Sequence, residues 1–280
     1  MHRLLPALGA VAFVAAAVAF SRQSPTSFPD QSPALKIASE ARNPWTHLKV
    51  NNDPEQFQFA VLSDRTGGHR EKVFSRAVRQ INLLQPEFVM SVGDLIEGYT
   101  KNDERIAAEW REFQTYASKF EMPFFYVPGN HDLANKTMAE NWGNRFGRAY
   151  YHFVYKDVLF LAVNSEDPHT KQISPEQLAY FKKALAENAG AKWTLVFLHQ
   201  PLWVGDADKS GWKAMEDLLA GRKYTVFCGH VHRYQKYVRN GMNYYQLATT
   251  GGGSRLRGVR YGEFDQIVWA TMKSTGPVLA

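Results

Sequence analysis

The sequence predicts one α/β domain with the architecture of a four-layer αββα sandwich, in which helices flank two mixed β-sheets. Three observations support this prediction. Beyond about Gln56, apolar strand-like runs alternate with amphipathic helical patterns, and from Tyr150 onward hairpin patterns replace them. The length of 280 residues is enough for one substantial core. Strand–helix units followed by hairpins imply two sheets packed face to face, with the helices outside.

The first residues have the composition of a targeting segment. Met1-His2-Arg3 is positively charged, Leu4–Phe20 is apolar without a charge, and Ala17-Val18-Ala19 resembles a cleavage site. The apolar run reaches the lower limit for a membrane span. We therefore expect residues 1–20 to be a signal peptide or an N-terminal anchor. The protein would then be exported, with a periplasmic or extracellular location, and it would stay on the membrane if the segment is retained.

The next stretch, Ser21–Pro33, is rich in Ser, Pro and Gln, a composition typical of flexible linkers. We expect a tether over residues 21–50 and a domain over residues 51–280. Cys228 is the single cysteine, so the chain forms no internal disulfide and no cysteine-rich metal site.

Helical patterns follow the first two strands and precede a later one. Ser174-Pro175-Glu176-Gln177 marks a helix start, because it offers a cap, a proline at the first position and a Gln that closes the capping box. The residues expected to face the core are Val73, Phe74, Ala77, Val78, Ile81 and Leu84 on the first helix, Ile106, Trp110, Phe113 and Phe120 on the second, and Leu178, Phe181 and Leu185 on the third.

Two hairpins are expected in the second half of the chain. Tyr150–Tyr155 and Leu159–Asn164 flank Lys156-Asp157. Tyr234–Arg239 and Asn243–Ala248 flank Asn240-Gly241, which is the strongest short hairpin signal. A last strand is expected over Phe264–Thr271.

Five of the apolar strands end in polar turns. Because strand ends of α/β proteins meet at one edge, we expect these turns to lie together. Their carboxylate, amide and imidazole groups suit Mn, Fe or Zn better than Ca. The strands are Phe57–Leu62, Phe88–Val92, Phe124–Val127, Trp193–Leu198 and Tyr224–Cys228, and the turns are Ser63-Asp64-Arg65-Thr66, Gly93-Asp94, Gly129-Asn130-His131-Asp132, Leu198-His199-Gln200-Pro201 and Gly229-His230-Val231-His232.

The charge balance is mildly basic, with 33 Lys and Arg against 27 Asp and Glu. This balance fits an ordinary soluble surface, and it also fits attraction to an anionic substrate. No run of Lys and Arg is interleaved with aromatic residues, so we do not expect nucleic acid as the partner.

The order and strand-end position of these turns resemble the signature of the calcineurin-like metallophosphoesterases, which include the purple acid phosphatases. The resemblance covers roughly residues 57–232 and implies a centre of two divalent or mixed-valence transition metal ions that activate a bridging water. It implies that Asp94 bridges the metals, that Asp64 and His232 bind the first, and that the second is bound by Asn130, His199 and His230. His131 would be the acid that protonates the leaving group, and Asp132 would orient its ring.

The first turn departs from the family pattern. The family usually has Asp-x-His there, whereas this chain has Asp64-Arg65-Thr66, so the first metal lacks an expected imidazole. Three replacements are open: Glu97, His69 behind Gly67-Gly68, or Thr66 or a water in a weaker site.

Arginines near the turns are candidate substrate contacts, because guanidinium groups pair bidentately with phosphate. Each also fits a solvated surface charge. Trp203 and Tyr99 lie just beyond motif turns and are candidates for the pocket wall or for the core. The arginines are Arg65, Arg70 and Arg255, with Arg257 and Arg260 beyond them.

The sequence therefore predicts an exported, metal-dependent phosphoesterase that hydrolyses phosphomonoesters or phosphodiesters of a phosphorylated small molecule or other ester. One alternative is a catalytically impaired protein on the same scaffold that binds a phosphorylated ligand. It would bind without turnover, in contrast to the enzyme. The other alternative is an extracellular nuclease, whose nucleic-acid binding would weaken with salt.

Overall fold

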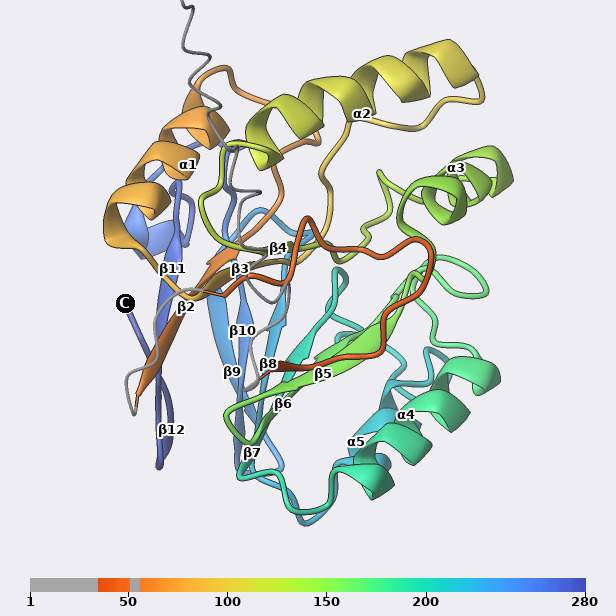
Figure 1. The fold of residues 1–280 in the computed structure, drawn as a ribbon, viewed down its shortest axis with the longest axis vertical. Coiled ribbons are helices and arrows are strands. Elements are labelled where there is room, and N and C mark those ends of the chain that lie inside the picture. Colours follow the sequence, from red (N-terminus) through yellow and green to blue (C-terminus); the bar gives the residue numbers. More distant parts are fainter. Residues whose placement is uncertain (1–34, 51–55) are drawn as a thin grey trace, which may run out of the picture.

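The computed structural model describes residues 35–50 and 56–280, and it confirms the predicted fold. Two mixed β-sheets pack face to face and helices cover their outer faces (Figure 1). The predicted targeting segment, residues 1–20, and residues 21–34 of the predicted tether lie outside the described residues. Within the described ranges, no helix combines the length and apolarity needed to cross a membrane.

One sheet has five strands in the order β12-β11-β2-β3-β4. β2, β3 and β4 are parallel, since helices return the chain between them, and β11 and β12 are antiparallel to their neighbours. The elements of this half are β2 (Phe57–Leu62), α1 (Val73–Leu84), β3 (Phe88–Ser91), α2 (Asp103–Ala117), β4 (Phe124–Phe125), α3 (Lys136–Phe146), β11 (Val268–Lys273) and β12 (Gly276–Leu279).

The other sheet has seven strands in the order β1-β5-β6-β7-β8-β10-β9. Its four central strands, β6, β7, β8 and β10, are parallel, and the two expected hairpins supply β5 beside β6 and β9 beside β10. The elements are β1 (Leu35–Lys36), β5 (Tyr151–Tyr155), β6 (Val158–Ala162), α4 (Pro175–Glu187), β7 (Trp193–Phe197), α5 (Trp212–Leu218), β8 (Tyr224–Cys228), β9 (Gln235–Arg239) and β10 (Met242–Gln246), followed by the 3₁₀ turn η1 (Val259–Tyr261).

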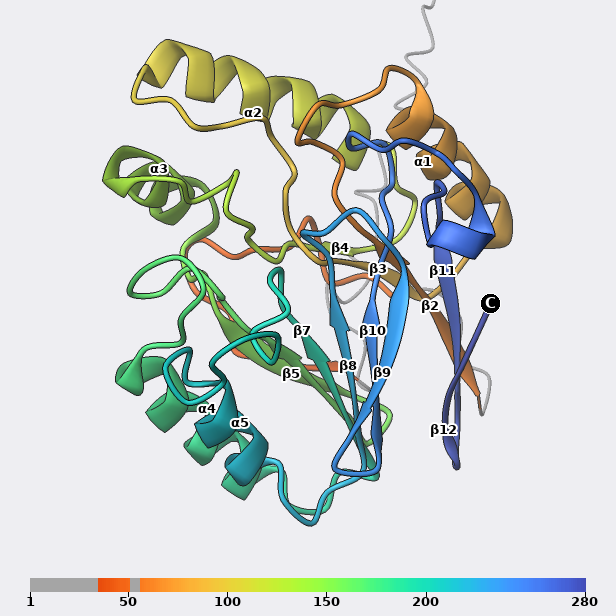
Figure 2. The ribbon, with the colours of Figure 1, turned by 180° about the vertical axis from the view of Figure 1, so that it is seen from behind.

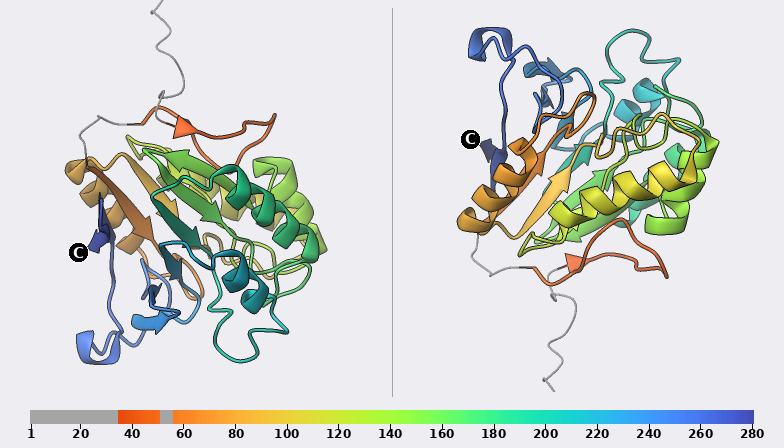
Figure 3. Two further views of the ribbon diagram at one scale, coloured as in Figure 1. Left: turned by 90° about the horizontal axis from the view of Figure 1, so that it is seen from below. Right: turned by 90° about the horizontal axis from the view of Figure 1, so that it is seen from above.

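Three apolar layers hold the four structural layers together. The layer between the sheets is largely aromatic, with Phe59, Phe88 and Phe160 packed edge-to-face and stacked. A second layer joins the five-stranded sheet to α1, α2 and α3, and a third joins the seven-stranded sheet to α4 and α5 (Figures 2 and 3). Burial of apolar area on both faces of each sheet is the main force that fixes their relative position.

Several elements differ from the sequence prediction. The expected strand Phe264–Thr271 begins only at Val268, and β12 follows it through a tight turn. Pro277 obscured β12 in the sequence, because proline is tolerated in a strand only at a sheet edge. The helices α3 and α5 lie in stretches for which no element was expected from the sequence. Leu84, expected to face the core, is 54% exposed in the last turn of α1.

Residues 35–50 lie within the range expected to be a tether, yet they contact the domain. Leu35 is buried and pairs with Tyr155, which makes β1 the edge of the seven-stranded sheet. The backbone of Thr46 donates to the carbonyl of Phe124, and Trp45 packs edge-to-face on Tyr151. This segment therefore covers the edge of both sheets near β4 and β5.

Candidate metal centre

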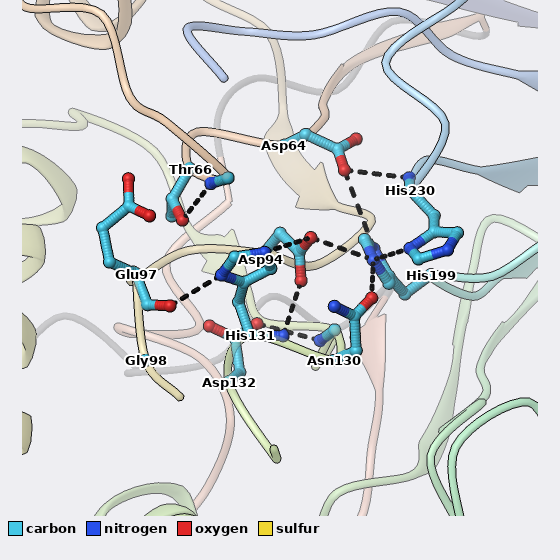
Figure 4. A network of polar contacts seen from close by, with 12 residues as sticks. Asp64, Thr66, Asp94, Glu97, Gly98, Asn130, His131, Asp132, His199 and His230 are labelled. Atoms are coloured by element: carbon cyan, nitrogen blue, oxygen red, sulfur yellow. Dashed lines mark hydrogen bonds and ion pairs between the residues drawn. The ribbon is translucent and has the colours of Figure 1, made fainter. Parts of the chain in front are cut away.

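The polar turns after five strands meet at one edge of the sandwich, as the sequence predicted. The turns after β2, β3 and β4 come from the five-stranded sheet, and the turns after β7 and β8 come from the seven-stranded sheet (Figure 4). Their side chains form two groups in which the possible ligand atoms all lie within 4.8 Å of one another. The first group is Asp94, His199 and His230, and the second is Asp64, Asp94 and His232.

The first group converges on the Nε2 atom of His199. Within 3.2 Å of that atom lie Oδ2 of Asp94 at 3.1 Å, Oδ1 of Asn130 at 2.9 Å and Nδ1 of His230 at 3.2 Å. Nδ1 of His199 lies 2.8 Å from the carbonyl oxygen of Val92, which directs Nε2 toward the other three groups. A histidine held in this way presents a fixed nitrogen to a cation.

The second group is organised around Asp64, which is fully buried. Its Oδ1 lies 3.3 Å from Nε2 of His232 and accepts a 2.8 Å hydrogen bond from the backbone of His230. Nδ1 of His232 lies 2.6 Å from the carbonyl oxygen of Gly253, so this ring is also oriented by the backbone. Asp94 belongs to both groups, which is the geometry that a bridging ligand needs.

The electrostatics of the cluster favour positive charge between the carboxylates. Burial alone would raise the pKa of Asp94, but the charges and hydrogen bonds of His199 and His131 outweigh it and lower that pKa to about 2. Burial likewise opposes protonation of His199, yet Asp94 and Asp64 raise its pKa to about 10. Burial and the charge of His199 lower the pKa of His230 to about 4. Two buried carboxylates with three imidazoles and an amide are a donor set that fits two transition metal ions.

The backbone around the cluster is held in uncommon conformations. Asp94, His230 and His232 have φ values of 56°, 71° and 55°, in the left-handed region that non-glycine residues rarely adopt. Two glycines allow the turns to approach the carboxylates. A Cβ at Gly129 would lie 2.3 Å from Oδ1 of Asp94, and one at Gly229 would lie 2.2 Å from Oδ2 of Asp64. Strain of this kind persists where a functional arrangement is fixed by its surroundings.

His131 lies beside the cluster with one ring nitrogen available. Its Nδ1 is 2.6 Å from the carbonyl oxygen of Glu97, its Nε2 is 4.0 Å from Oδ2 of Asp94, and its ring packs edge-to-face against Tyr99. Asp132 forms no hydrogen bond with the ring of His131, which the resemblance implied that it would orient, but binds the backbone instead. Its carboxylate is fully buried and accepts from the backbone of Leu95, Ile96 and Gly129, so it joins two turns.

The residues considered for the missing imidazole lie outside both ligand groups. The hydroxyl of Thr66 donates to the carbonyl oxygen of Ile96 and accepts from the backbone of Gly67. The carboxylate of Glu97 is directed away from Asp94 (Figure 4). It accepts from the backbone of Gly68 and from the backbone of His69 at 2.8 Å, and it pairs with the His69 ring at 3.3 Å. As placed here, Glu97 and His69 close a loop at the rim and do not complete the first metal site.

Two of the three candidate substrate arginines are engaged elsewhere. Arg65 is buried and binds the carbonyl oxygen of Leu95 and the carboxylate of Glu112. Arg70 forms a bidentate pair with Asp265.

Arg255 is exposed and lines a cavity of about 300 Å³ together with His232. Beyond it, Arg257 pairs with Glu263, and Arg260 lies over the ring of Tyr261. Trp203 belongs to the core beside Trp212 and Tyr244.

Larger cavities open on the other sides of the cluster. One of about 530 Å³ reaches His230, and one of about 730 Å³ reaches Asn130 and Tyr99. Tyr99 is exposed, and its hydroxyl accepts a 2.8 Å hydrogen bond from Nδ2 of Asn130, so it forms part of the wall. Lys171 in the first of these cavities could not be recognised from the sequence, because it lies in a long loop without a motif.

Two ligand groups share the buried carboxylate of Asp94 at the strand ends of a two-sheet sandwich, with a histidine beside them, and this arrangement suits metal-dependent hydrolysis. Residues 57–234 match the family model described as calcineurin-like phosphoesterase. The chain belongs to this family.

Curated relatives are similar in sequence to this chain, and a solved structure is similar in fold. The chain is 28% identical over 195 residues to the serine/threonine-protein phosphatase CPPED1 of Mus musculus, covering 59% of this chain and 60% of that protein. It is 26% identical to the 3',5'-cyclic adenosine monophosphate phosphodiesterase CpdA of Haemophilus influenzae, covering 75% of this chain and 77% of that protein. The purple acid phosphatase PPD1 from yellow lupin (Lupinus luteus) has the same fold, with a TM-score of 0.54, 14% identity and coverage of 78% of this chain and 50% of the lupin chain.

Proposed function

We propose that this protein is an exported phosphoesterase that hydrolyses phosphomonoesters or phosphodiesters at a centre of two transition metal ions. The sharing of Asp94 between the two ligand groups is the observation that supports a dinuclear centre most directly. The Asp64–Asp94–His232 group would hold one ion, and Asp94, Asn130, His199 and His230 the other. Export is supported by the composition of residues 1–20.

Two bound cations would supply Lewis-acid chemistry, neutralising phosphate charge and activating water. Proton transfer to the leaving group and the orientation of the proton donor would be the roles of this chain's own residues. The carbonyl oxygen of Glu97 accepts from Nδ1 of His131 and leaves Nε2 facing the cluster. From this position a protonated His131 can donate its Nε2 proton to the leaving oxygen. The rate gain from this donation increases as the leaving group becomes more basic. Tyr99 packs against the ring and restricts its rotation.

The test uses the full chain loaded with Mn²⁺ or Zn²⁺ and two generic esters, an aryl phosphate and a bis-aryl phosphate. We expect turnover of at least one ester, which is lost on chelation and regained on adding the metal. Asp94→Asn should abolish it, and His131→Ala should lower kcat by about 10²–10⁴-fold. Lys183→Ala on the exposed face of α4 is the control and should leave kcat unchanged.

The second candidate, a protein that binds a phosphorylated ligand without turnover, is favoured by the Thr66 hydroxyl, which is engaged with the backbone at the first site. Metal-loaded protein that binds an aryl phosphonate but leaves both esters intact would overturn the enzymatic proposal in favour of this one.

A further inference from the structure

The cavity beside His230 is framed by two loops that each contribute a lysine. It has a volume of about 530 Å³ and includes Lys171 from the loop 165–173 and Lys209 from the loop 201–211. Leu202 and Val231 give it apolar walls. Because His230 also lines it, the cavity borders the candidate metal centre.

Hydrogen bonds fix the two loops against each other. The backbone of Ile173 donates to the carbonyl oxygen of Ser210 at 2.9 Å, which joins the loops directly. The amide of Gln200 donates to the carboxylate of Glu166 at 2.8 and 2.9 Å and to the hydroxyl of Thr170 at 2.8 Å. The lysine-bearing segments are therefore held in place, and a ligand there would meet a largely formed site.

The polar groups in this cavity have unused binding capacity. Lys171 and Lys209 are exposed, and neither ammonium forms an ion pair with another residue of the ranges 35–50 and 56–280. Gln200 is 1% exposed, and its Oε1 is buried without a hydrogen-bond partner in the described part of the chain. Asp206 is the acidic residue in the lining. Because Oε1 of Gln200 is buried, the two exposed ammonium groups are the ones available to a ligand, and they suit a ligand that carries an anionic group.

The other cavities suit a second anion less well. The one beside Asn130 has Glu166 and Asp167 in its lining against Lys136. In the smaller one beside His232, Arg257 is already paired with Glu263, which leaves Arg255.

We propose that the cavity beside His230 is a subsite for a second anionic group on the substrate, so that the preferred esters are phosphates of an alcohol that also carries a carboxylate or another phosphate. This inference rests on the proposed function, because the reacting phosphate is taken to lie at the candidate metal centre. Lys171 and Lys209 bind the second anion, while Leu202 and Val231 contact the apolar part that connects the two groups.

The test compares three esters that differ only in the distal group: phenyl phosphate, 4-carboxyphenyl phosphate and 1,4-phenylene bisphosphate. Release of phosphate by the full, metal-loaded chain gives kcat/KM for each. In Lys171→Ala, we expect the preference for the anionic esters over phenyl phosphate to fall by about tenfold, the usual scale of one charge-assisted hydrogen bond. Lys209→Ala should act in the same direction, and Lys171→Arg should recover most of the preference. The ester with the larger loss shows whether carboxylate or phosphate is the group bound.

Three matched variants locate the effect. Lys136→Ala probes the cavity beside Asn130, Arg255→Ala probes the one beside His232, and Lys183→Ala on α4 controls for the loss of a distant charge. A preference that responds to Lys136→Ala or Arg255→Ala and not to the two lysines would overturn the proposal. So would an equal loss for all three esters in Lys171→Ala.

Calorimetric binding of 4-carboxyphenylphosphonate and phenylphosphonate separates this inference from the proposed function. If the protein fails to turn over any ester but binds the carboxylated phosphonate more tightly, and Lys171→Ala removes that difference, the subsite stands and the hydrolase proposal fails. If esters are hydrolysed but the two phosphonates bind alike, the hydrolase stands and the subsite fails.

Discussion

At the scale of single residues, Glu97 contacts both the candidate acid His131 and the loop at Gly68 and His69. Its carbonyl oxygen binds the ring of His131 at 2.6 Å, while its carboxylate binds the backbone of Gly68 and His69. Burial would raise the pKa of this carboxyl, but the hydrogen bonds from the His69 and Gly68 backbones, the His69 ring and the charge of His131 lower it, so the group is ionised at neutral pH. Glu97 therefore fixes both the candidate acid and the loop beside it.

Glu97→Ala removes the acceptor of the Gly68 and His69 backbones, so it should loosen the main chain whose carbonyl holds His131 and weaken the alignment of that ring without removing metal. We expect kcat to fall by about tenfold or more for a phosphate of an alkyl alcohol, which needs the proton, and much less for a nitrophenyl ester, which does not. Glu97→Gln keeps a carbonyl acceptor for the loop and should retain most activity. Metal content per chain is the second measurement. Loss of a metal in Glu97→Ala would instead show that this carboxylate replaces the missing imidazole as a ligand of the first metal.

The sequence located the candidate ligands but not the contacts of their neighbours. Asp64, Asp94 and His230 were predictable because strand ends of parallel sheets meet at one edge, whichever way the loops run. Asp132 and Arg65 sit in the same turns, yet their side chains bind backbone groups of the next turn and a helix. The partner of such a side chain depends on how separate segments pack, and residue spacing along the chain does not predict that packing.

At the scale of elements, a buried carboxylate on α5 holds that helix against the outer hairpin. Glu216 is 5% exposed and accepts from Arg239 on β9 at 2.8 and 3.0 Å and from the hydroxyl of Tyr244 on β10 at 2.9 Å. Burial would raise the pKa of Glu216, but the hydrogen bonds from Arg239 and Tyr244 outweigh it and the pKa is lowered. A carboxylate whose pKa is lower in the folded than in the unfolded protein stabilises the fold at pH values above its ordinary pKa. This contribution is lost as the pH falls through the folded-state pKa.

Glu216→Gln should therefore lower the free energy of unfolding at pH 7 by about 1–3 kcal/mol, because a charge-assisted network is weakened. The difference from the unchanged protein should shrink as the pH drops below about 4.5, the ordinary pKa of a glutamate. Urea unfolding at pH 7 and at pH 3.5 measures both values. Asp217→Asn, beside it on the exposed face, is the control and should have little effect at either pH. If the two proteins differ in free energy of unfolding as much at pH 3.5 as at pH 7, the destabilisation comes from altered packing and not from the lost charge.

Elements were predictable where a periodic pattern was long and its turn chemistry specific. The helix α4 begins as its cap and proline indicated, and the second hairpin turns at Asn240-Gly241 as expected, with Arg239 opposite Met242. The strand expected over Phe124–Val127 is shortened to the two residues of β4, and α5 has only seven residues, too few for a periodic pattern to separate it from a loop. Their positions are set by the sheet and the core around them.

At the scale of the whole molecule, the candidate site lies where the two sheets meet. Asp64 and Asp94 follow strands of the five-stranded sheet, whereas His199, His230 and His232 follow strands of the seven-stranded sheet. Each of the two ligand groups contains members from both sheets. A bound ion would therefore join the halves of the sandwich across their common edge, in addition to the aromatic layer between them.

Metal binding should then stabilise the complete fold against unfolding. With free metal at about a hundred times its dissociation constant, the gain is about 2.7 kcal/mol for each site. A domain of this size should show a rise in Tm of about 5–10 °C for each site that is filled when Mn²⁺ or Zn²⁺ is added to chelator-treated protein. Asp94→Asn should lose most of this rise, because Asp94 belongs to both groups, whereas Glu97→Ala should keep it. Scanning calorimetry with and without metal gives the increments, and an equal rise in Asp94→Asn would show that the metal binds elsewhere.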